Sequence, residues 1–307
     1  MSPAEVVVLG NLGVDTNVYL PPQVPAGSAE TTFTENLDCV GQAGGYASLG
    51  YARLGRRTAF IGHVGDDAPG RLCRDTLAEA GVDLRALFLD PEGTARSVNL
   101  MAPDGSRRNF YDGKGHARLH PDPAACRGVL AGARLAHVNL AAWTRDLLPV
   151  ARDLGLTVAC DLQDVVDPGD PYRAPYIREA DILFFSSANH GNPGPLIQAF
   201  LSARPDRIVV AALGPRGCVL GTRAGLREFP AETLDRPVVD TNGAGDSLAV
   251  GFLTAHVLEG RSLEASIRRG QLAARHACTL RGTSDGLLTA AELEALARDA
   301  GIEGQRR

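Results

Sequence analysis

The second half of the chain alternates short apolar runs with helix-compatible segments, and this alternation limits the possible folds more than any other feature. From about residue 130 onward, runs typical of buried strands recur at intervals that leave room for a helix between them. Such alternation predicts an α/β fold with a mostly parallel central sheet flanked by helices. The expected strands are Leu135–Leu140, Thr157–Asp161, Asp181–Phe185 and Arg207–Leu213.

The N-terminal part adds one buried strand and two separate β segments. A β-branched run, Val6–Leu9, stops at a glycine, as a short buried strand does. Residues 16–40 and 87–111 lack helical periodicity, and the second segment contains two strand-like runs around a Pro-Asp-Gly turn. We expect these two segments to form a small sheet, set against a body of residues 1–15, 41–86 and 112–300, with residues 301–307 as a frayed tail.

Helical patterns are confined to the body. They are expected at Ala47–Leu54, at Gly70–Ala80, between the strands, and in three segments at the C-terminal end. The last of these begins at Thr289, whose spacing to Glu292 is that of a capping box.

Charge and cysteine usage exclude several classes of partner. The chain has 31 basic and 36 acidic residues and a net charge of −5, which gives no electrostatic reason to expect a nucleic acid or an anionic membrane as a partner. The apolar runs fall far short of the roughly 20 residues that span a bilayer. The first residues lack the pattern of a secretory signal, and the six cysteines lie far apart. We therefore expect a cytoplasmic protein with reduced thiols.

Lysine occurs once, at position 114, so any chemistry that requires lysine must use this position. A Walker A loop needs Ser or Thr after its lysine, whereas Gly115 follows here. A protein-kinase lysine lies inside a strand, whereas Lys114 lies between two glycines. A Schiff-base lysine remains open only at this position.

The most specific motif is Asp240-Thr-Asn-Gly-Ala-Gly-Asp246, which precedes a helix-compatible run. Glycines at the start of a helix leave backbone N–H groups uncovered, and these groups bind anions with help from the helix dipole. A Rossmann loop would need glycine at position 248, where Leu248 stands. A carboxylate beside a bound phosphate is repulsive unless it has a task, and accepting a proton from an attacking hydroxyl is one. The alternative is that Asp246 only complements the helix N-terminus.

A second segment, from Gly41 to Gly70, is rich in glycine. It contains Gly41-Gln-Ala-Gly44-Gly45 and, further on, Gly62-x-x-Gly65-Asp66-Asp67. Taken alone, these glycines are explained by tight turns or by backbone that approaches a ligand.

Taken together, the two motifs resemble those of the ribokinase-like, or PfkB, family of carbohydrate and nucleoside kinases. The resemblance spans essentially the whole chain and implies a nine-stranded type of central sheet with a β lid built from the two early β segments. It implies that Asp246 is the general base and that the N–H groups of Gly243, Ala244 and Gly245 form an anion hole. It further implies an acceptor site at Asp15, Asn11, Gly41, Gly45 and Tyr46, and a nucleotide site at Gly214, Gly217, Asn189, Gln271 and Gly282.

The chain departs from the family pattern at several of these positions. Gln42 and Tyr46 stand where the family has Gly and Asn, so contacts with the acceptor must differ. The family's Asn-x-x-Glu motif, tied to magnesium and phosphate, is lost, since Ser186 and Asn189 occupy its ends. Ala212 replaces a threonine before the nucleotide turn.

Other patterns are weaker. The sequence around Ser284 fits a hydrolase Gly-x-Ser-x-Gly motif, but no histidine follows His276 to complete a triad. We interpret His116 and His120 as a solvated loop pair, and Arg107 with its basic neighbours as a solvated edge, with a phosphate contact as the alternative.

The sequence therefore predicts an ATP-dependent kinase that phosphorylates a hydroxymethyl group of a sugar or sugar-like compound. ATP and Mg²⁺ are the expected cofactors, with a monovalent cation as a further candidate. A nucleoside acceptor is the first alternative, because Tyr46 could stack on a base. A non-catalytic ligand-binding relative is the second. The exposed edge of the lid suggests a homodimer.

Overall fold

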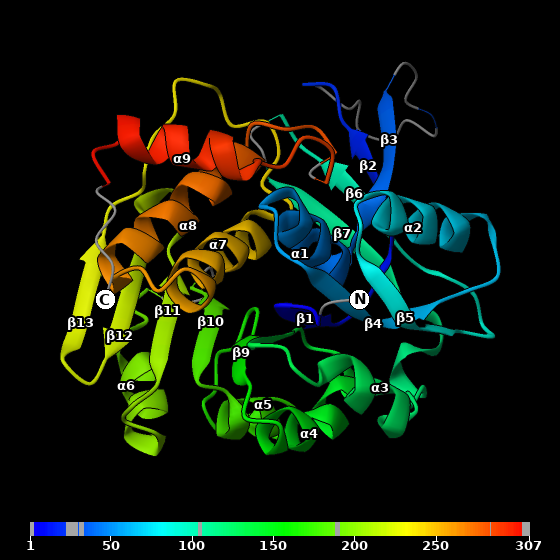
Figure 1. The fold of residues 1–307 in the computed structure, drawn as a ribbon. Helices are drawn as coiled ribbons and strands as arrows, with labels where there is room; N and C mark the ends of the chain where they lie inside the picture. The colour runs from blue at the N-terminus through cyan, green and yellow to red at the C-terminus, as the bar shows by residue number, and fades with distance from the viewer. Residues whose placement is uncertain are drawn as a thin grey trace.

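The structure, a computed structural model, describes residues 3–22, 30, 34–103, 106–187, 191–282 and 284–302. A nine-stranded sheet crosses the body, as expected for the α/β class (Figure 1). Strands β12 and β13 are antiparallel to their neighbours, and the others pair in parallel. The order across the sheet is β13 (Gly225–Phe229), β12 (Cys218–Thr222), β11 (Ile208–Ala212), β10 (Ile182–Ser186), β9 (Thr157–Asp161), β8 (Leu135–Val138), β1 (Val6–Leu9), β4 (Thr58–Val64) and β5 (Asp83–Leu89).

Helices cover both faces of this sheet, and successive residues of one strand pack into two different cores. In β1, Val6 and Val8 face one core, whereas Val7 and Leu9 face the other. The first core is covered by α1 (Gln42–Arg53), α2 (Ala68–Glu79), α7 (Ala244–Leu253), α8 (Leu263–Ala277) and α9 (Ala290–Asp299). The second is covered by α3 (Pro123–Leu130), α4 (Leu148–Asp153), α5 (Ala174–Glu179) and α6 (Gly194–Ala203).

The C-terminal helices α7 and α8 lie unusually close together. A Cβ built at Gly251 would lie 2.9 Å from the Cα of Gly270, so glycine is required where the two helices meet. After α7 the chain forms one π-helical turn, Thr254–Leu258, before it turns back into α8. Within the described ranges, no helix has the length and apolar character needed to span a membrane.

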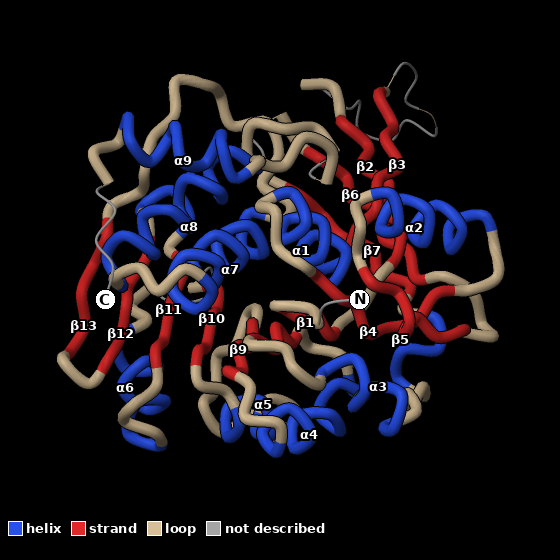
Figure 2. Tube along the Cα trace, viewed as in Figure 1, coloured by secondary structure: helices blue, strands red, loops and turns tan. Residues whose placement is uncertain are grey.

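A second, four-stranded sheet lies beside the body, next to α1 and α2 (Figures 1 and 2). Its order is β3 (Glu35–Gly41), β2 (Gly13–Tyr19), β6 (Ala95–Met101) and β7 (Arg107–Asp112). Its boundaries differ from those expected. Asp15 lies in the small sheet rather than in the body, and residues 87–89 belong to β5 of the large sheet.

Most expected elements are present, with shifted ends. Helix α1 begins five residues earlier than expected, and the β12–β13 hairpin was not anticipated. The capping box at Thr289 is present, and all six cysteines are free, five of them buried. Of the expected tail, residues 303–307 lie outside the described residues. Among the described residues, short 3-10 helices also occur at Lys114–Ala117, Ala142–Leu147 and Gly214–Arg216.

Candidate active site

The Asp240–Asp246 loop leads into the N-terminus of α7. Gly243 is the N-cap of α7 and has φ = 69°, a left-handed conformation that residues with side chains disfavour. The buried carboxylate of Asp240 holds the loop, because it accepts hydrogen bonds from the Asn242 N–H at 2.7 Å and from the Tyr19 hydroxyl at 2.8 Å. The loop is therefore fixed ahead of a helix whose first N–H groups lack partners within the helix.

Gly245 has no packing reason to be glycine. A Cβ built there meets nothing within 4 Å in the part of the chain that is described. Glycine inside a helix costs about 1 kcal/mol relative to alanine. A ligand that approaches the backbone would explain the residue, and free N–H groups at a helix N-terminus favour a phosphate there.

The Asp246 side chain, in the first turn of α7, is partly exposed. Burial, followed by the negative charge of Asp161, raises the pKa of Asp246 well above its usual range, and Arg107 opposes this rise. Asp161 ends strand β9, and burial raises the pKa of its carboxyl to about 6. The charge of Asp161 disfavours ionisation of Asp246, and the raised pKa makes Asp246 a better proton acceptor than an ordinary aspartate.

Arg107 connects the small sheet to this loop. It is the first residue of β7, and its Nη1 donates a hydrogen bond to Oδ1 of Asn242. Its positive charge also lowers the pKa of Asp246 and that of Asp240. A guanidinium at this place would attract the negative charge of a transferring phosphoryl group.

Asp15 is almost completely buried, and three side chains donate to its carboxylate. Gln42 Nε2 lies 2.7 Å from Oδ1, whereas the Tyr46 hydroxyl at 2.6 Å and Asn242 Nδ2 at 3.2 Å both reach Oδ2. Asn242 also donates to the Tyr46 hydroxyl, at 2.6 Å. The carboxylate predicted for the acceptor is therefore joined to the anion loop through one asparagine.

Two predicted acceptor-site glycines have different surroundings. A Cβ at Gly41 would lie 2.3 Å from Cγ of Asp15, so glycine is required for the carboxylate to sit where it does. At Gly45 the nearest atoms are side chains of the core, Leu12 and Val40, at 3.2 Å. Gly41 thus shapes the Asp15 site directly, and Gly45 serves the packing of α1.

Gln42 keeps a glycine-like backbone although it carries a side chain. Its φ is 64°, a left-handed conformation that costs roughly 1–2 kcal/mol for a residue with a Cβ. The side chain donates to Asp15 and, at 2.8 Å, to the Ser97 hydroxyl on β6. Strained backbone of this kind persists where the surroundings fix it, typically at functional sites.

Asn11 lies near the same site and is linked to the small sheet. Its Nδ2 donates to the Tyr111 hydroxyl at 3.1 Å, and Tyr111 in turn contacts His116 Nδ1 at 2.8 Å. Asn11 Oδ1 is buried without a hydrogen-bond partner among the described residues, and it is free to accept one from a ligand hydroxyl. The interpretation of a solvated histidine pair is wrong for His116, which is buried, whereas His120 is exposed.

The residues predicted for the nucleotide site that the structure describes lie in two regions, the turn after β11 and the segment formed by α8 and the chain after it. Gly214 and Gly217 form a tight turn after β11, and Gly217 has φ = 101° with no room for a Cβ beside the Phe229 carbonyl. Gln271 on α8 accepts the Glu232 N–H at 3.3 Å, and Gly282 donates to the Tyr19 hydroxyl at 3.0 Å. Asn189 lies outside the described residues.

Within the described ranges no group of three or more His, Cys, Asp or Glu side chains forms a complete metal site. Magnesium in nucleotide enzymes is bound through one or two carboxylates together with substrate phosphates. Asp161 is an oxygen donor whose negative charge acts on Asp246. Its chemistry therefore fits a Mg²⁺ ion that arrives with the nucleotide.

Sequence reasoning missed Asp161 and treated Arg107 as an edge residue. Asp161 had a usable signal, since it stands at the carboxyl end of an expected parallel strand, where ligands bind in open α/β sheets. For Arg107 the sequence offered a phosphate contact only as the alternative, and no local signal shows its contact with Asn242, because the two positions are 135 residues apart.

Comparisons with known proteins identify the family of the chain. Residues 175–290 match the family described as pfkB family carbohydrate kinase. An acarbose 7(IV)-phosphotransferase from Actinoplanes sp. is 33% identical over 293 residues, which cover 94% of this chain and 97% of that protein. A fructokinase from Klebsiella pneumoniae is 29% identical and covers 83% of this chain and 89% of that protein.

Solved structures give the same result. A microbiome-derived acarbose kinase, Mak1, superposes with a TM-score of 0.87 at 30% identity, covering 97% of this chain and all of that one. The Arabidopsis thaliana ribokinase complexed with ribose and ATP superposes with a TM-score of 0.80 over 96% of this chain and 99% of its own, and at 22% identity it supports the fold alone.

Proposed function

The chain belongs to the pfkB family of carbohydrate kinases and is an ATP-dependent phosphotransferase, and we propose that it transfers the γ-phosphoryl group of ATP to a hydroxymethyl group of a sugar or sugar-like acceptor. The observation that carries this proposal is the position of Asp246. Its carboxyl, with a raised pKa, follows directly on the Gly243–Gly245 backbone at the N-terminus of α7. A base and an anion site are thereby placed side by side.

In this reaction Asp246 accepts the proton of the acceptor hydroxyl as its oxygen attacks the γ-phosphorus. The N–H groups of Gly243, Ala244 and Gly245 face the charge that spreads over the transferring phosphoryl oxygens. Arg107 adds positive charge from the small sheet. Most of the rate enhancement then comes from positioning and from fixed dipoles rather than from covalent chemistry.

The acceptor is oriented by Asp15 and Asn11. Three donors already occupy Asp15, and a carboxylate offers about four lone-pair sites, so one hydroxyl of the acceptor can be accepted on Oδ1 beside Gln42. Asn11 Oδ1 accepts a second hydroxyl.

The cofactors follow from the same site. ATP lies between the Gly214–Gly217 turn and the anion loop, with Gln271 and Gly282 on its base side. Asp161 would hold Mg²⁺, which would neutralise phosphate charge when bound, and Asp246 stays available as the base. Dependence on Mg²⁺ is part of this proposal and is tested by the activity after chelation. Dependence on a monovalent cation is also part of it and is tested by comparing the activity in sodium, potassium and choline buffers.

The nucleoside alternative loses its main support. Tyr46 was the residue expected to stack on a base, but it is 4% exposed and its hydroxyl is bound to Asp15 and Asn242. Burial, followed by the charge of Asp15, raises the pKa of Tyr46 well above its ordinary value, so the phenol stays protonated and donates. Tyr46 thus holds the Asp15 carboxylate in place and offers no exposed ring face on which a base could stack.

Acceptor-dependent ADP release from the purified protein tests the proposal. The panel contains acarbose, fructose and ribose, which the names of relatives reported above suggest, and adenosine, which tests the nucleoside alternative. We expect release with a carbohydrate and none with adenosine. Binding of ATP without acceptor-dependent release for any carbohydrate would favour the non-catalytic alternative.

The six free cysteines support a reducing compartment such as the cytoplasm.

A further inference from the structure

A cavity of about 310 Å³ lies among α1, α7, α8 and α9, at the end of α7 that is far from Asp246. Ten residues of helix, at about 1.5 Å each, separate this end from the anion loop by roughly 15 Å. Leu54, Ala255 and Leu293 contribute apolar walls, while Thr254 and Arg269 contribute polar groups. The cavity is therefore separate from the phosphoryl-transfer site.

Arg269 gives this cavity an unused positive group. Its side chain is 4% exposed, and Nη2 donates to Oε2 of Glu294 at 2.7 Å. Its Nε and Nη1 atoms are buried and have no hydrogen-bond partner in the described part of the protein. Three N–H bonds of a guanidinium are thus left without an acceptor, and buried donors of a charged group are destabilising unless a partner accepts from them.

Thr254 adds a second unpaired group on the same cavity. It begins the π-helical turn after α7, and its hydroxyl is buried with no partner among the residues described. A hydroxyl donates one hydrogen bond, so it serves the same kind of ligand as the guanidinium does.

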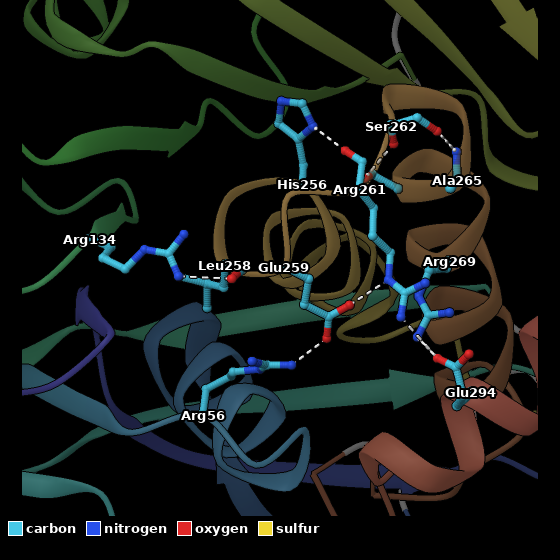
Figure 3. A network of polar contacts seen from close by, with 11 residues as sticks. Arg56, Arg134, His256, Leu258, Glu259, Arg261, Ser262, Ala265, Arg269 and Glu294 are labelled. Carbon is cyan, nitrogen blue, oxygen red and sulfur yellow. Dashed lines mark hydrogen bonds and ion pairs between the residues drawn. The ribbon is translucent and has the colours of Figure 1, made fainter. Parts of the chain in front are cut away.

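Arg269, Glu259 and Glu294 line the cavity and belong to an ion-pair network that, with Arg56 and Arg261 outside the lining, carries one positive charge in excess. Figure 3 shows Glu259 between Arg56 and Arg261, and Glu294 facing Arg261 and Arg269. Three guanidinium groups therefore share two carboxylates. A ligand with a single negative charge would complete the balance, whereas a doubly charged phosphate would be repelled by the two glutamates.

The mouth of the cavity is formed by the first turn of α9. Ala290 and Ala291 line it and are exposed, directly after the Thr289 N-cap. The first N–H groups of a helix lack partners within the helix, and the helix dipole favours an anion there. The capping box of Thr289 already places the Glu292 carboxylate at this terminus, so the unpaired Arg269 donors, and not α9, set the sign of the ligand's charge.

We propose that this cavity binds a small aliphatic monocarboxylate. Its carboxylate accepts hydrogen bonds from Arg269 and Thr254, and its alkyl part packs against Leu54, Ala255 and Leu293. The planar guanidinium matches the geometry of a carboxylate, and the apolar walls can pack against an alkyl chain, which an inorganic ion lacks.

Titration calorimetry with butyrate tests the proposal, with ADP present in excess to fill the nucleotide site. We expect saturable butyrate binding to the wild type. Butanamide, which has the same shape without the charge, and inorganic phosphate should both bind at least roughly tenfold more weakly. Equal binding of butyrate and butanamide, stronger binding of phosphate, or no saturable binding of butyrate at millimolar concentrations would each overturn the proposal.

Two variants locate the binding. Thr254→Val removes only the hydroxyl and no existing hydrogen bond, and Arg269→Met removes the guanidinium; each should weaken butyrate binding by roughly tenfold or more. Thr76→Val on α2, outside the cavity, is the matched control and should bind as the wild type does. Should Arg269→Met fail to fold, Thr254→Val decides. Wild-type butyrate affinity in Thr254→Val would refute the assignment, whatever the kinase activity of the protein.

Discussion

Replacement of Gly41 by alanine separates the acceptor site from the nucleotide site. The backbone of Gly41 is extended, with φ = −137°, so alanine causes no backbone strain. The added Cβ would lie 2.3 Å from Cγ of Asp15 and 2.6 Å from both carboxylate oxygens, against about 3.4 Å for ordinary contact, so the carboxylate must retreat by about 1 Å. Its hydrogen bonds from Gln42 and Tyr46, now 2.7 and 2.6 Å long, then break or bend.

We expect the acceptor kcat/KM of Gly41→Ala to fall by roughly 100-fold, because a misplacement of about 1 Å in a positioning group costs that much. The KM for ATP should stay near the wild-type value, since no nucleotide group moves. Gly45→Ala is the matched control, because its Cβ meets only Leu12 and Val40, at 3.2 Å.

Steady-state kinetics with the acceptor and ATP varied in turn, after a melting curve shows that each variant is folded, measures both constants. An acceptor kcat/KM within about threefold of wild type, a difference of less than 1 kcal/mol, would refute the role of Asp15 in binding the acceptor. An equal loss in Gly45→Ala would show that the effect is one of core packing.

Three further outcomes follow from the site and one from the small sheet. Asp246→Asn should cut turnover by roughly 100- to 10,000-fold while ATP affinity stays or rises, since a negative charge is lost beside the phosphates; turnover within a few-fold of wild type would exclude the base. Its raised native pKa lies above the unfolded value, so stability falls as pH rises through that window, and the variant should melt no lower than wild type at neutral pH. In the pH profile of kcat, the acid limb should lie above the ordinary carboxyl range, because it reports the raised pKa of Asp246. The limb should move to lower pH in Asp161→Asn, which removes a charge that raises this pKa, and to higher pH in Arg107→Met, which removes a charge that lowers it. Limbs that do not move would contradict the coupling of these groups. A homodimer through the small sheet, where all of β7 is exposed and Phe110 is 49% exposed, should become a monomer in Phe110→Asp by light scattering, and a monomeric wild type would rule this dimer out.

The fold was largely predictable because the central strands of the large sheet are buried on both faces. Apolar runs such as those of β1 and β9, when they alternate with helices, predict the buried strands of a parallel sheet. The β13 strand was missed because four of its five residues are exposed and its pattern is not apolar. The start of α1 was missed because Gly44 and Gly45 lower helix propensity, and only packing against Asn11 and Leu12 explains their presence in a helix.

The site was predictable only where its residues are adjacent in sequence. Gly243–Asp246 is one continuous segment, so its chemistry could be inferred from order and spacing alone. The contacts of Asn242 with Asp15, Tyr46 and Arg107 span 227, 196 and 135 residues, and no local pattern encodes them. They depend on how the small sheet is set against the body, which is a property of the folded chain.

Asn242 makes the acceptor site and the phosphate site parts of one structure. Its amide nitrogen donates to Asp15 and Tyr46, and its amide oxygen accepts from Arg107 of the small sheet. A rotation of this amide would exchange donor for acceptor and break all three contacts, so its orientation links the acceptor carboxylate, the anion loop and the small sheet. An acceptor that binds Asp15 therefore lies against a residue of the same loop that carries the base, Asp246, four positions further along the chain. Positioning of this kind, rather than the affinity of any single contact, is what a phosphoryl transfer between two bound substrates requires.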